Sequence, residues 1–122
     1  VLMHHGLWRF PFNGSFNETG QTFMPIFDEY QVDLVFSGHV HSYSRSFPLK
    51  DGMKSDQGTV YISTGRSGDR VWPRSPGKPL DAVFYNPIDQ PNYLTLEASK
   101  DSLQVKAFNL DGTSIDQVKI EK

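Results

Sequence analysis

The sequence predicts an α/β fold in which a strand–helix–strand unit is followed by an antiparallel β meander. Two short apolar runs, Val1–His4 and Val32–Ser37, flank a segment of helical periodicity at 23–31. This order is typical of two parallel strands joined by a right-handed crossover. Apolar and polar residues then alternate over 93–120, as in antiparallel strands with one buried face. We expect one domain over residues 1–122, of α/β (α+β) class.

Composition bounds the class of protein. The 122 residues suffice for one hydrophobic core, and 37% hydrophobic with 13% aromatic residues is not a disordered composition. The net charge of −2 and the lack of a basic block argue against a general nucleic-acid or membrane-surface binder. The chain has no cysteine, which excludes disulfide scaffolds and cysteine zinc sites. No apolar run approaches the roughly 20 residues of a membrane span.

The first strand and the helix are predicted from local signals. The chain opens inside the apolar run Val1–His4, so we expect an upstream portion to be missing; an unusual processed N-terminus is the alternative. Thr22 is expected to cap the helix, with Pro25 in the first turn, where its missing N–H costs little. One buried helical face is predicted from the spacing of Phe23, Ile26, Phe27 and Tyr30.

The remaining strands follow in order. Val32–Ser37 reads as a strand buried on both faces, Tyr43–Leu49 as a short strand and Thr59–Thr64 as a β-branched strand. Residues 65–91 are rich in Pro and Gly without a clear period, and so long a connection is often functional. The meander strands are predicted at Tyr93–Ala98, Leu103–Phe108 and Ile115–Ile120, with turns at Lys100-Asp101 and Asp111-Gly112.

Three histidines are candidate metal ligands. His39 and His41 are separated by one residue, so in extended backbone their side chains face the same side. Gly38 lets the chain turn sharply before them. His4 ends the other apolar strand, and the carboxyl ends of parallel strands share one edge, where α/β sheets bind ligands. The three imidazoles can therefore converge there; the alternative is a set of surface or core histidines without a ligand.

These motifs resemble a known superfamily. The string VDLVFSGHVHSYSR (32–45), preceded by FDEY and by VLMHH, resembles the C-terminal half of a calcineurin-like metallophosphoesterase. It is most similar to the purple acid phosphatase branch, in which G-H-x-H-x-Y-x-R is characteristic. The resemblance runs from Val1 to about Gly68 and continues more loosely through the tail. It implies a two-sheet β sandwich with helices outside.

The resemblance also implies a dinuclear metal site. It places His4 and His39 on one metal and His41 on the other, with Fe, Zn or Mn as the ions. The other ligands of such enzymes come from upstream motifs, which are not found here before Val1. The implied reaction is hydrolysis of phosphate esters by metal-bound hydroxide. The resemblance further implies an exported bacterial phosphatase, secreted or in the cell envelope. The chain alone should be nearly inactive, and its exposed sheet edges should favour self-association.

Other candidate residues carry two interpretations each. His5 is expected on the opposite face from His4, as a catalytic proton donor or phosphate contact, or as a packed or second-shell histidine. Tyr43 would position the loop that carries His39 and His41 (the histidine loop), or fill the core. Arg45 would attract the phosphate, or be solvated. Arg66 would reach the same edge as a substrate-binding group, or belong to a plain turn. Trp72 would wall the cleft or, as we favour, cover core.

The sequence departs from the family pattern at two places. Residues 6–21 lack the histidines that the branch often carries, and Trp8, Arg9, Phe10 and Phe12 stand there instead. Ser44 replaces the usual glutamate. These departures leave the general acid open and suggest a different substrate pocket.

Two other function classes remain open at this point. A binding or scaffold module would carry the histidines as a vestigial or mononuclear metal site. A β-rich adhesive domain would account for the meander, although not for the helix and the histidine loop.

Overall fold

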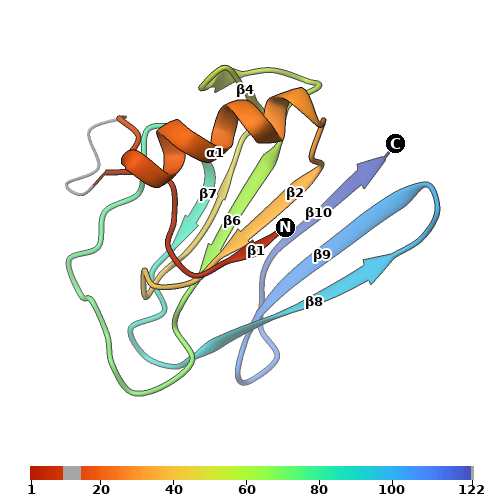
Figure 1. Cartoon of the computed structure of the whole chain (residues 1–122). Coiled ribbons are helices and arrows are strands. Elements are labelled where there is room, and N and C mark those ends of the chain that lie inside the picture. The colour runs from red at the N-terminus through yellow and green to blue at the C-terminus, as the bar shows by residue number, and fades with distance from the viewer. Residues whose placement is uncertain (10–14, 122) are drawn as a thin grey trace.

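The computed structural model describes residues 1–9 and 15–121, and its central element is a five-stranded mixed sheet (Figure 1). The strands lie in the order β1-β2-β6-β3-β7. Their bounds are Leu2–Met3 (β1), Leu34–Ser37 (β2), Val60–Thr64 (β6), Tyr43–Ser46 (β3) and Asp81–Tyr85 (β7). β1 pairs parallel with β2, and β2 pairs parallel with β6, so the predicted parallel unit is confirmed. The carboxyl ends of these three strands meet at one edge.

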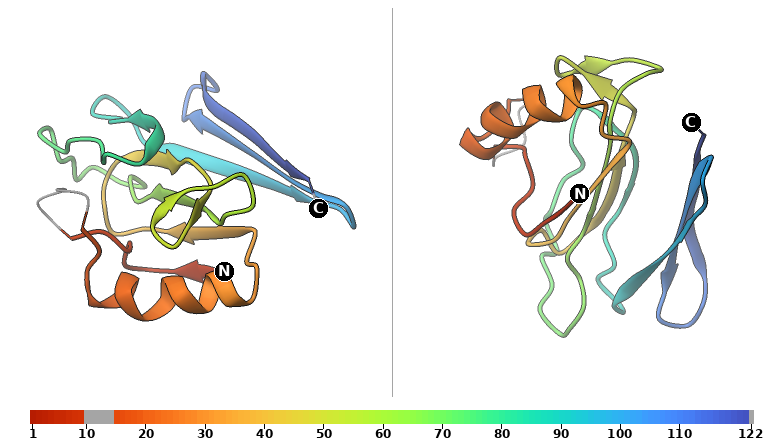
Figure 2. Two further views of the ribbon diagram at one scale, coloured as in Figure 1. Left: turned by 90° about the horizontal axis from the view of Figure 1, so that it is seen from above. Right: turned by 45° about the vertical axis from the view of Figure 1, so that its right-hand side comes forward.

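A second, three-stranded sheet packs on one face of the first. Its strands are antiparallel, in the order β10-β9-β8, which confirms the predicted meander. They span Asn92–Ala98 (β8), Ser102–Asn109 (β9) and Ser114–Glu121 (β10). The opposite face is covered by the helix α1 (Glu18–Glu29), so the chain forms three layers (Figure 2). The predicted α/β class, with a two-sheet sandwich and an outer helix, is therefore confirmed.

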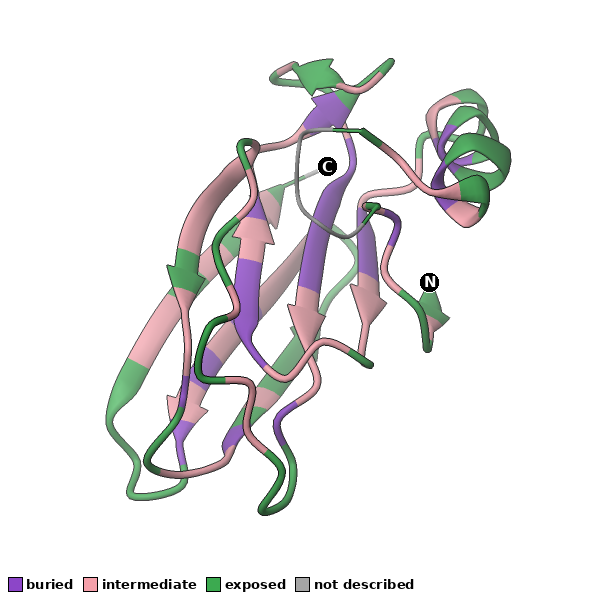
Figure 3. Cartoon of the chain, turned by 90° about the vertical axis from the view of Figure 1, so that its left-hand side faces the viewer, coloured by how far each residue is buried: buried purple, intermediate pink, exposed green. Residues whose placement is uncertain are grey.

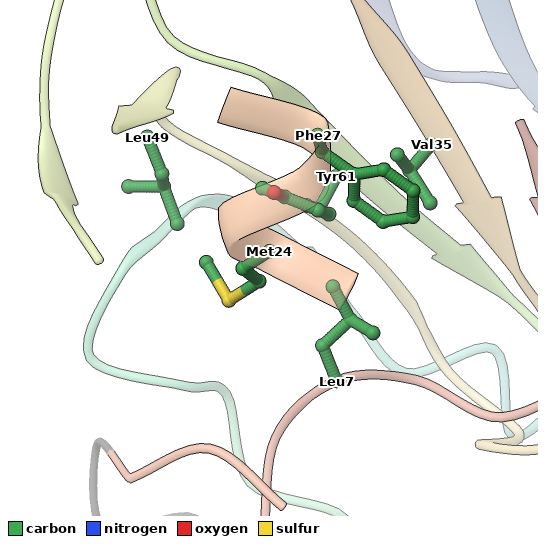
Figure 4. Close-up of a cluster of buried hydrophobic side chains, with 6 residues drawn as sticks. All are labelled: Leu7, Met24, Phe27, Val35, Leu49 and Tyr61. Carbon is green, nitrogen blue, oxygen red and sulfur yellow. The ribbon is translucent and has the colours of Figure 1, made fainter. Parts of the chain in front are cut away.

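Two apolar clusters fill the spaces between the layers. The helix-side cluster comprises Leu7, Met24, Phe27, Val35, Leu49 and Tyr61 (Figure 4). The inter-sheet cluster comprises Leu34, Tyr43, Val60, Ile62, Val105 and Ala107. β2 and β6 contribute residues to both clusters, and the buried positions of the sheet concentrate in its central strands β2, β6 and β3 (Figure 3). At the edge, Leu2 of β1 is 81% exposed, and among the described residues no strand pairs with its outer side.

The helix differs from its prediction in start and in buried face. It begins at Glu18, capped by Asn17 and not by Thr22, so Pro25 lies inside it. Phe27 is buried as expected. The other buried positions are Gly20 and Met24, whereas Phe23, Ile26 and Tyr30 are exposed.

Gly20 explains the choice of face. A Cβ on Gly20 would lie 2.3 Å from the carbonyl oxygen of Leu7, so only glycine lets the helix approach this loop. The apolar residues of the helix form two neighbouring stripes, either of which could face the core. The approach at Gly20 turns the Met24 stripe inward.

Asn17 ties the helix to the loop that follows β1. Its side-chain oxygen accepts a hydrogen bond from Gly20 N at 2.8 Å, and its amide donates to Gly6 O at 2.9 Å. We expect Asn17→Ala to lower the free energy of unfolding by about 1–2 kcal/mol, because it removes a helix cap and a loop contact. Urea denaturation measures this. Glu29→Ala, at an exposed position of the same helix, is the control and should change stability by only a few tenths of a kcal/mol.

The Pro- and Gly-rich segment 65–91 contains a strand that the sequence did not reveal. β7 pairs antiparallel with β3, and a salt bridge between Lys78 and Asp81 (3.0 Å) stabilises the turn that leads into it. The predicted strand at Tyr43–Leu49 is divided into β3 and β4 (Leu49–Lys50), and β4 forms a hairpin with β5 (Met53–Lys54). Within the described residues, no helix has the length and apolar character that crossing a membrane requires.

Candidate metal centre

Two parallel strands deliver histidines to the same sheet edge. His4 follows β1 and His39 follows β2, and the register pairs Met3, directly before His4, with Ser37, two residues before His39. The two exits are joined by a hydrogen bond from Gly38 N to His4 O at 3.0 Å. The predicted convergence of His4 and His39 therefore follows from the strand pairing, and their ring centroids are 5.3 Å apart.

The histidine loop has a specific backbone shape. His39 adopts a left-handed φ of 62°, which is uncommon for a residue other than glycine. The exit of β6 packs against this loop, because a Cβ on Gly65 would lie 2.4 Å from the carbonyl oxygen of Val40. Because Gly65 has no side chain, the histidine loop can lie close against the exit of β6. No sequence pattern indicates this contact, since the two segments are distant along the chain.

His5 lies within the cluster and not on the opposite face. The strand β1 ends at Met3, so the alternation of side chains on which the prediction rested does not extend to His5. Its ring centroid is 4.3 Å from that of His39 and 4.9 Å from that of His4. One potential ligand atom from each of the three side chains lies within 4.8 Å of the others. His5 is also exposed, which excludes a packed core role.

His41 stands apart from that cluster, with its own partners. Its Nδ1 lies 2.7 Å from the backbone oxygen of Arg70. A carbonyl can only accept, so Nδ1 carries the proton and Nε2 is left as the nitrogen available to a metal. The ring stacks on Trp72 at 5.1 Å with an interplanar angle of 12°. Trp72 therefore walls the site and does not cover core, which corrects the sequence-based interpretation.

The cluster favours the neutral form of His39. Burial, followed by the neighbouring imidazoles of His5 and His4, lowers the pKa of His39 below its ordinary value of 6.5. Only the neutral imidazole binds a metal ion. The arrangement therefore keeps this nitrogen available as a ligand at lower pH than an isolated histidine would.

A cavity of about 560 Å³ opens beside the histidines. This volume suits a small-molecule site. His5 and His39 lie on its wall, and the indoles of Trp8 and Trp72 line it as well. Lys78 Nζ lies 5.2 Å from the centroid of the Trp8 ring, which is a cation–π distance. The cavity thus combines planar apolar walls with cationic and imidazole groups.

Tyr43 and Arg45 point to the other side of the sheet. The Tyr43 hydroxyl donates to Asp116 Oδ2 at 2.6 Å, and Arg45 binds both carboxylate oxygens at 2.6 and 3.1 Å. Asp116 belongs to β10, so this group joins the two sheets. Arg45 is therefore held in an ion pair between the layers and is not brought to the histidines, contrary to the expected phosphate contact. Tyr43 is 1% exposed and fills the core, although it follows directly on the histidine loop.

The pKa values in this triad reflect its mutual contacts. The hydrogen bond to Asp116 raises the pKa of Arg45, despite burial. Burial opposes ionisation of Asp116, but the hydrogen bonds from Arg45 and Tyr43 outweigh it and hold the pKa of the carboxyl below its usual value. Burial and the Asp116 contact raise the pKa of the Tyr43 hydroxyl. The tyrosine therefore stays protonated and continues to donate.

Arg66 is also kept from the cavity. The residue is 5% exposed, its guanidinium donates to the carbonyl oxygen of Gly68, and its own carbonyl accepts from Asn92 N. These contacts hold the backbone that follows β6, which agrees with the alternative that Arg66 belongs to a turn. Among the aromatic residues that replace the family's loop histidines, Trp8 lines the cavity, and Phe10 and Phe12 lie outside the described residues.

Comparisons with known proteins agree with this architecture. The solved structure of purple acid phosphatase PPD1 from yellow lupin (Lupinus luteus) seeds superposes with a TM-score of 0.78 at 21% identity, over 98% of this chain. The chain has the fold of part of a purple acid phosphatase. Purple acid phosphatase 19 of Arabidopsis thaliana is 37% identical over 84 residues, covering 59% of the chain. The resemblance to the purple acid phosphatase branch of the calcineurin-like metallophosphoesterases is confirmed.

An uncharacterized protein of Mycobacterium tuberculosis is 47% identical over 90 residues, covering 60% of the chain. No protein-family model matches the sequence. This chain corresponds to only part of the length of each of these relatives. The chain spans 16% of the mycobacterial protein, 19% of the Arabidopsis protein and 24% of the lupin chain.

Proposed function

We propose that this chain forms part of a metal-dependent phosphoesterase that hydrolyses phosphate esters. The observation that carries the proposal is the convergence of His4 and His39 at the carboxyl edge of the parallel strands, with His41 two residues further along the loop that carries His39. This is the edge at which such sheets bind ligands.

The residues present fit a metal site. Neutral imidazole is a good ligand for Zn and Fe, and the Arg70 carbonyl orients His41 as an outer-shell partner should. His4 and His39 would hold one ion and His41 a second, together with ligands from outside this chain. When bound, such ions supply Lewis acidity toward the phosphate oxygens and lower the pKa of water.

The cavity would receive the organic part of the ester. The phosphate would lie toward the imidazoles at its wall, and the Trp8 and Trp72 indoles would contact the apolar body of the leaving group. Hydrolysis breaks the bond between phosphorus and the leaving oxygen, which must then take up a proton. The groups named here would bind and orient the ester.

The test uses the longest natural protein that contains this chain. Phosphomonoesterase activity is measured with Fe, Zn or Mn, and we expect His39→Asn to lower kcat by at least about 100-fold. Asparagine tolerates the left-handed backbone at this position, so the loop should keep its shape. The control is Tyr30→Ala, at the 72% exposed C-cap residue of the helix, which should retain activity.

Two results would count against the proposal. One is an inactive natural protein whose histidines bind the metals normally, because this would favour a binding module. The other is robust, His39-dependent turnover by the 122-residue chain alone, since we expect the ligands outside it to be required.

A further inference from the structure

We propose that the cavity beside the histidines selects phosphate esters whose leaving group carries a planar aromatic ring system, which packs against the indoles of Trp8 and Trp72. As a statement about the ester, this inference rests on the proposed function and narrows its substrate class. As a statement about the cavity, it requires only that the cavity prefer a flat ring to a puckered one, and this can be measured without hydrolysis.

Both tryptophans of the chain line this one cavity. Trp8 lies in the loop that follows β1, and Trp72 lies in the connection between β6 and β7, far along the chain. Two indoles at one cavity present large flat surfaces with few polar atoms. The volume of about 560 Å³ is within the range of cavities that enclose most of a drug-sized molecule, so it admits two fused rings.

The Trp8 indole is held by three contacts. Its residue pairs with Phe16 in an antiparallel bridge, and the Tyr61 ring makes a T-shaped contact with it at 5.6 Å and 87°. Lys78 Nζ lies 5.2 Å from its ring centroid and is itself held by Asp81 at 3.0 Å. Since the indole is already ordered, a ligand that packs against it binds without a large entropy cost for the protein.

Trp72 connects the cavity to the proposed reaction centre. Its carbonyl oxygen accepts hydrogen bonds from the Asn86 amide at 2.9 Å and from Ser75 N at 3.1 Å, which hold the backbone at this point. Its ring stacks on His41 and lies 5.9 Å from the His39 ring at an interplanar angle of 90°. A leaving group that packs against this indole therefore lies beside the imidazoles near which the phosphate would bind.

The flat walls favour an aromatic group over a saturated group of similar size. Both kinds of group bury apolar surface, so burial alone discriminates little between them. A flat ring gains further from offset-stacked or edge-to-face contact with an indole, and a puckered ring cannot adopt these arrangements. For contact with two indoles, this gain corresponds to a preference of roughly tenfold.

The experiment compares two esters on the longest natural protein that contains this chain. Naphthylmethyl phosphate and decahydronaphthylmethyl phosphate both release a primary alcohol, and they differ in the flatness of the ring system. We expect kcat/KM to be at least about tenfold higher for the naphthyl ester. Equal values for the two esters, or turnover of other phosphomonoesters but not of the naphthyl ester, would overturn the inference and leave the proposed function intact.

Trp8 is the informative position for substitution, because a change at Trp72 would also remove the contacts with His39 and His41. Trp8→Leu should lower the ratio of the two kcat/KM values at least about threefold, whereas Trp8→Phe, which keeps a flat ring, should preserve most of it. The control is Tyr93→Leu, a similar change at a 43% exposed position of β8, which should not alter the ratio. A ratio that Trp8→Leu leaves unchanged would contradict the inference. Far-UV circular dichroism checks the fold of each variant.

A binding measurement separates this inference from the proposed function and needs no variant. If the natural protein hydrolysed no phosphate ester, the proposed function would fail, but the cavity could still bind the two alcohols. Ligand-observed NMR without added metal should give a dissociation constant at least about tenfold lower for naphthylmethanol than for decahydronaphthylmethanol. Equal binding of the two alcohols would overturn the inference.

Discussion

Replacing Asp116 by asparagine is expected to lower the free energy of unfolding by about 3 kcal/mol. Asp116 accepts two hydrogen bonds from Arg45 and one from Tyr43, and its side chain is only 8% exposed. Asparagine removes the negative charge and leaves the Arg45 guanidinium, 16% exposed, without its counter-ion between the sheets. Urea denaturation at neutral pH measures the loss. Because this triad lies on the opposite side of the sheet from the helix-side core, we expect the meander to loosen first.

The charge of Asp116 also predicts a dependence on pH. Its folded-state pKa lies below the ordinary value of 3.8, so the carboxylate stabilises the fold above about pH 4 and loses this effect as pH falls through the folded pKa. The difference between wild type and Asp116→Asn should therefore be full at neutral pH and shrink in acid. Asp101→Asn, an exposed change of the same charge, controls for net charge. A difference that stays constant into strong acid would contradict this account.

Substituting Gly65 by alanine is expected to move the loop that carries His39 and to weaken Zn²⁺ binding at the proposed metal centre at least about tenfold. The new Cβ would lie 2.4 Å from the Val40 oxygen and 2.9 Å from the Val40 carbon, both backbone atoms. A backbone segment cannot rotate away as a side chain can, so the loop that carries His39 must shift. Overpacking of this kind costs about 1–3 kcal/mol. Zinc titration and urea denaturation measure the two effects separately.

Gly68→Ala is the matched control for this substitution. It makes the same chemical change three positions further along the segment, where a Cβ would meet nothing within 4 Å. We expect zinc binding to be unchanged and stability to change little. If both variants lost zinc binding equally, the effect would come from the flexibility of the segment and not from the contact with Val40.

The histidine site shows which inferences sequence patterns support. The pairing of His4 with His39 was predictable, because two apolar runs on either side of a helical segment imply parallel strands with a common edge. The place of His5 was not predictable, since it depends on the strand ending two residues before it. Strand ends are set by pairing partners, and β1 pairs with β2 over only two positions.

Arg45 and Arg66 show the converse case. Each cation near a candidate phosphate site could be assigned to the substrate, and the sequence offered no means to find a competing partner. Asp116 lies 71 residues beyond Arg45, and it reaches the arginine only because the second sheet packs on the first. The buried face of the helix was undetermined for a similar reason. Its apolar residues form two stripes, and the contact of Gly20 with the Leu7 loop selected one of them.

The sequence by itself determined the α/β class, the parallel unit, the meander and the edge at which His4 and His39 meet. These features follow from local periodicity, which reports which residues must leave water. Only the tertiary structure decided that His5 joins the cluster, that Arg70 and Trp72 hold His41, and that Arg45 is bound by Asp116. These are contacts between segments distant along the chain. They depend on packing and on the ends of strands, and neither of these leaves a local pattern in the sequence.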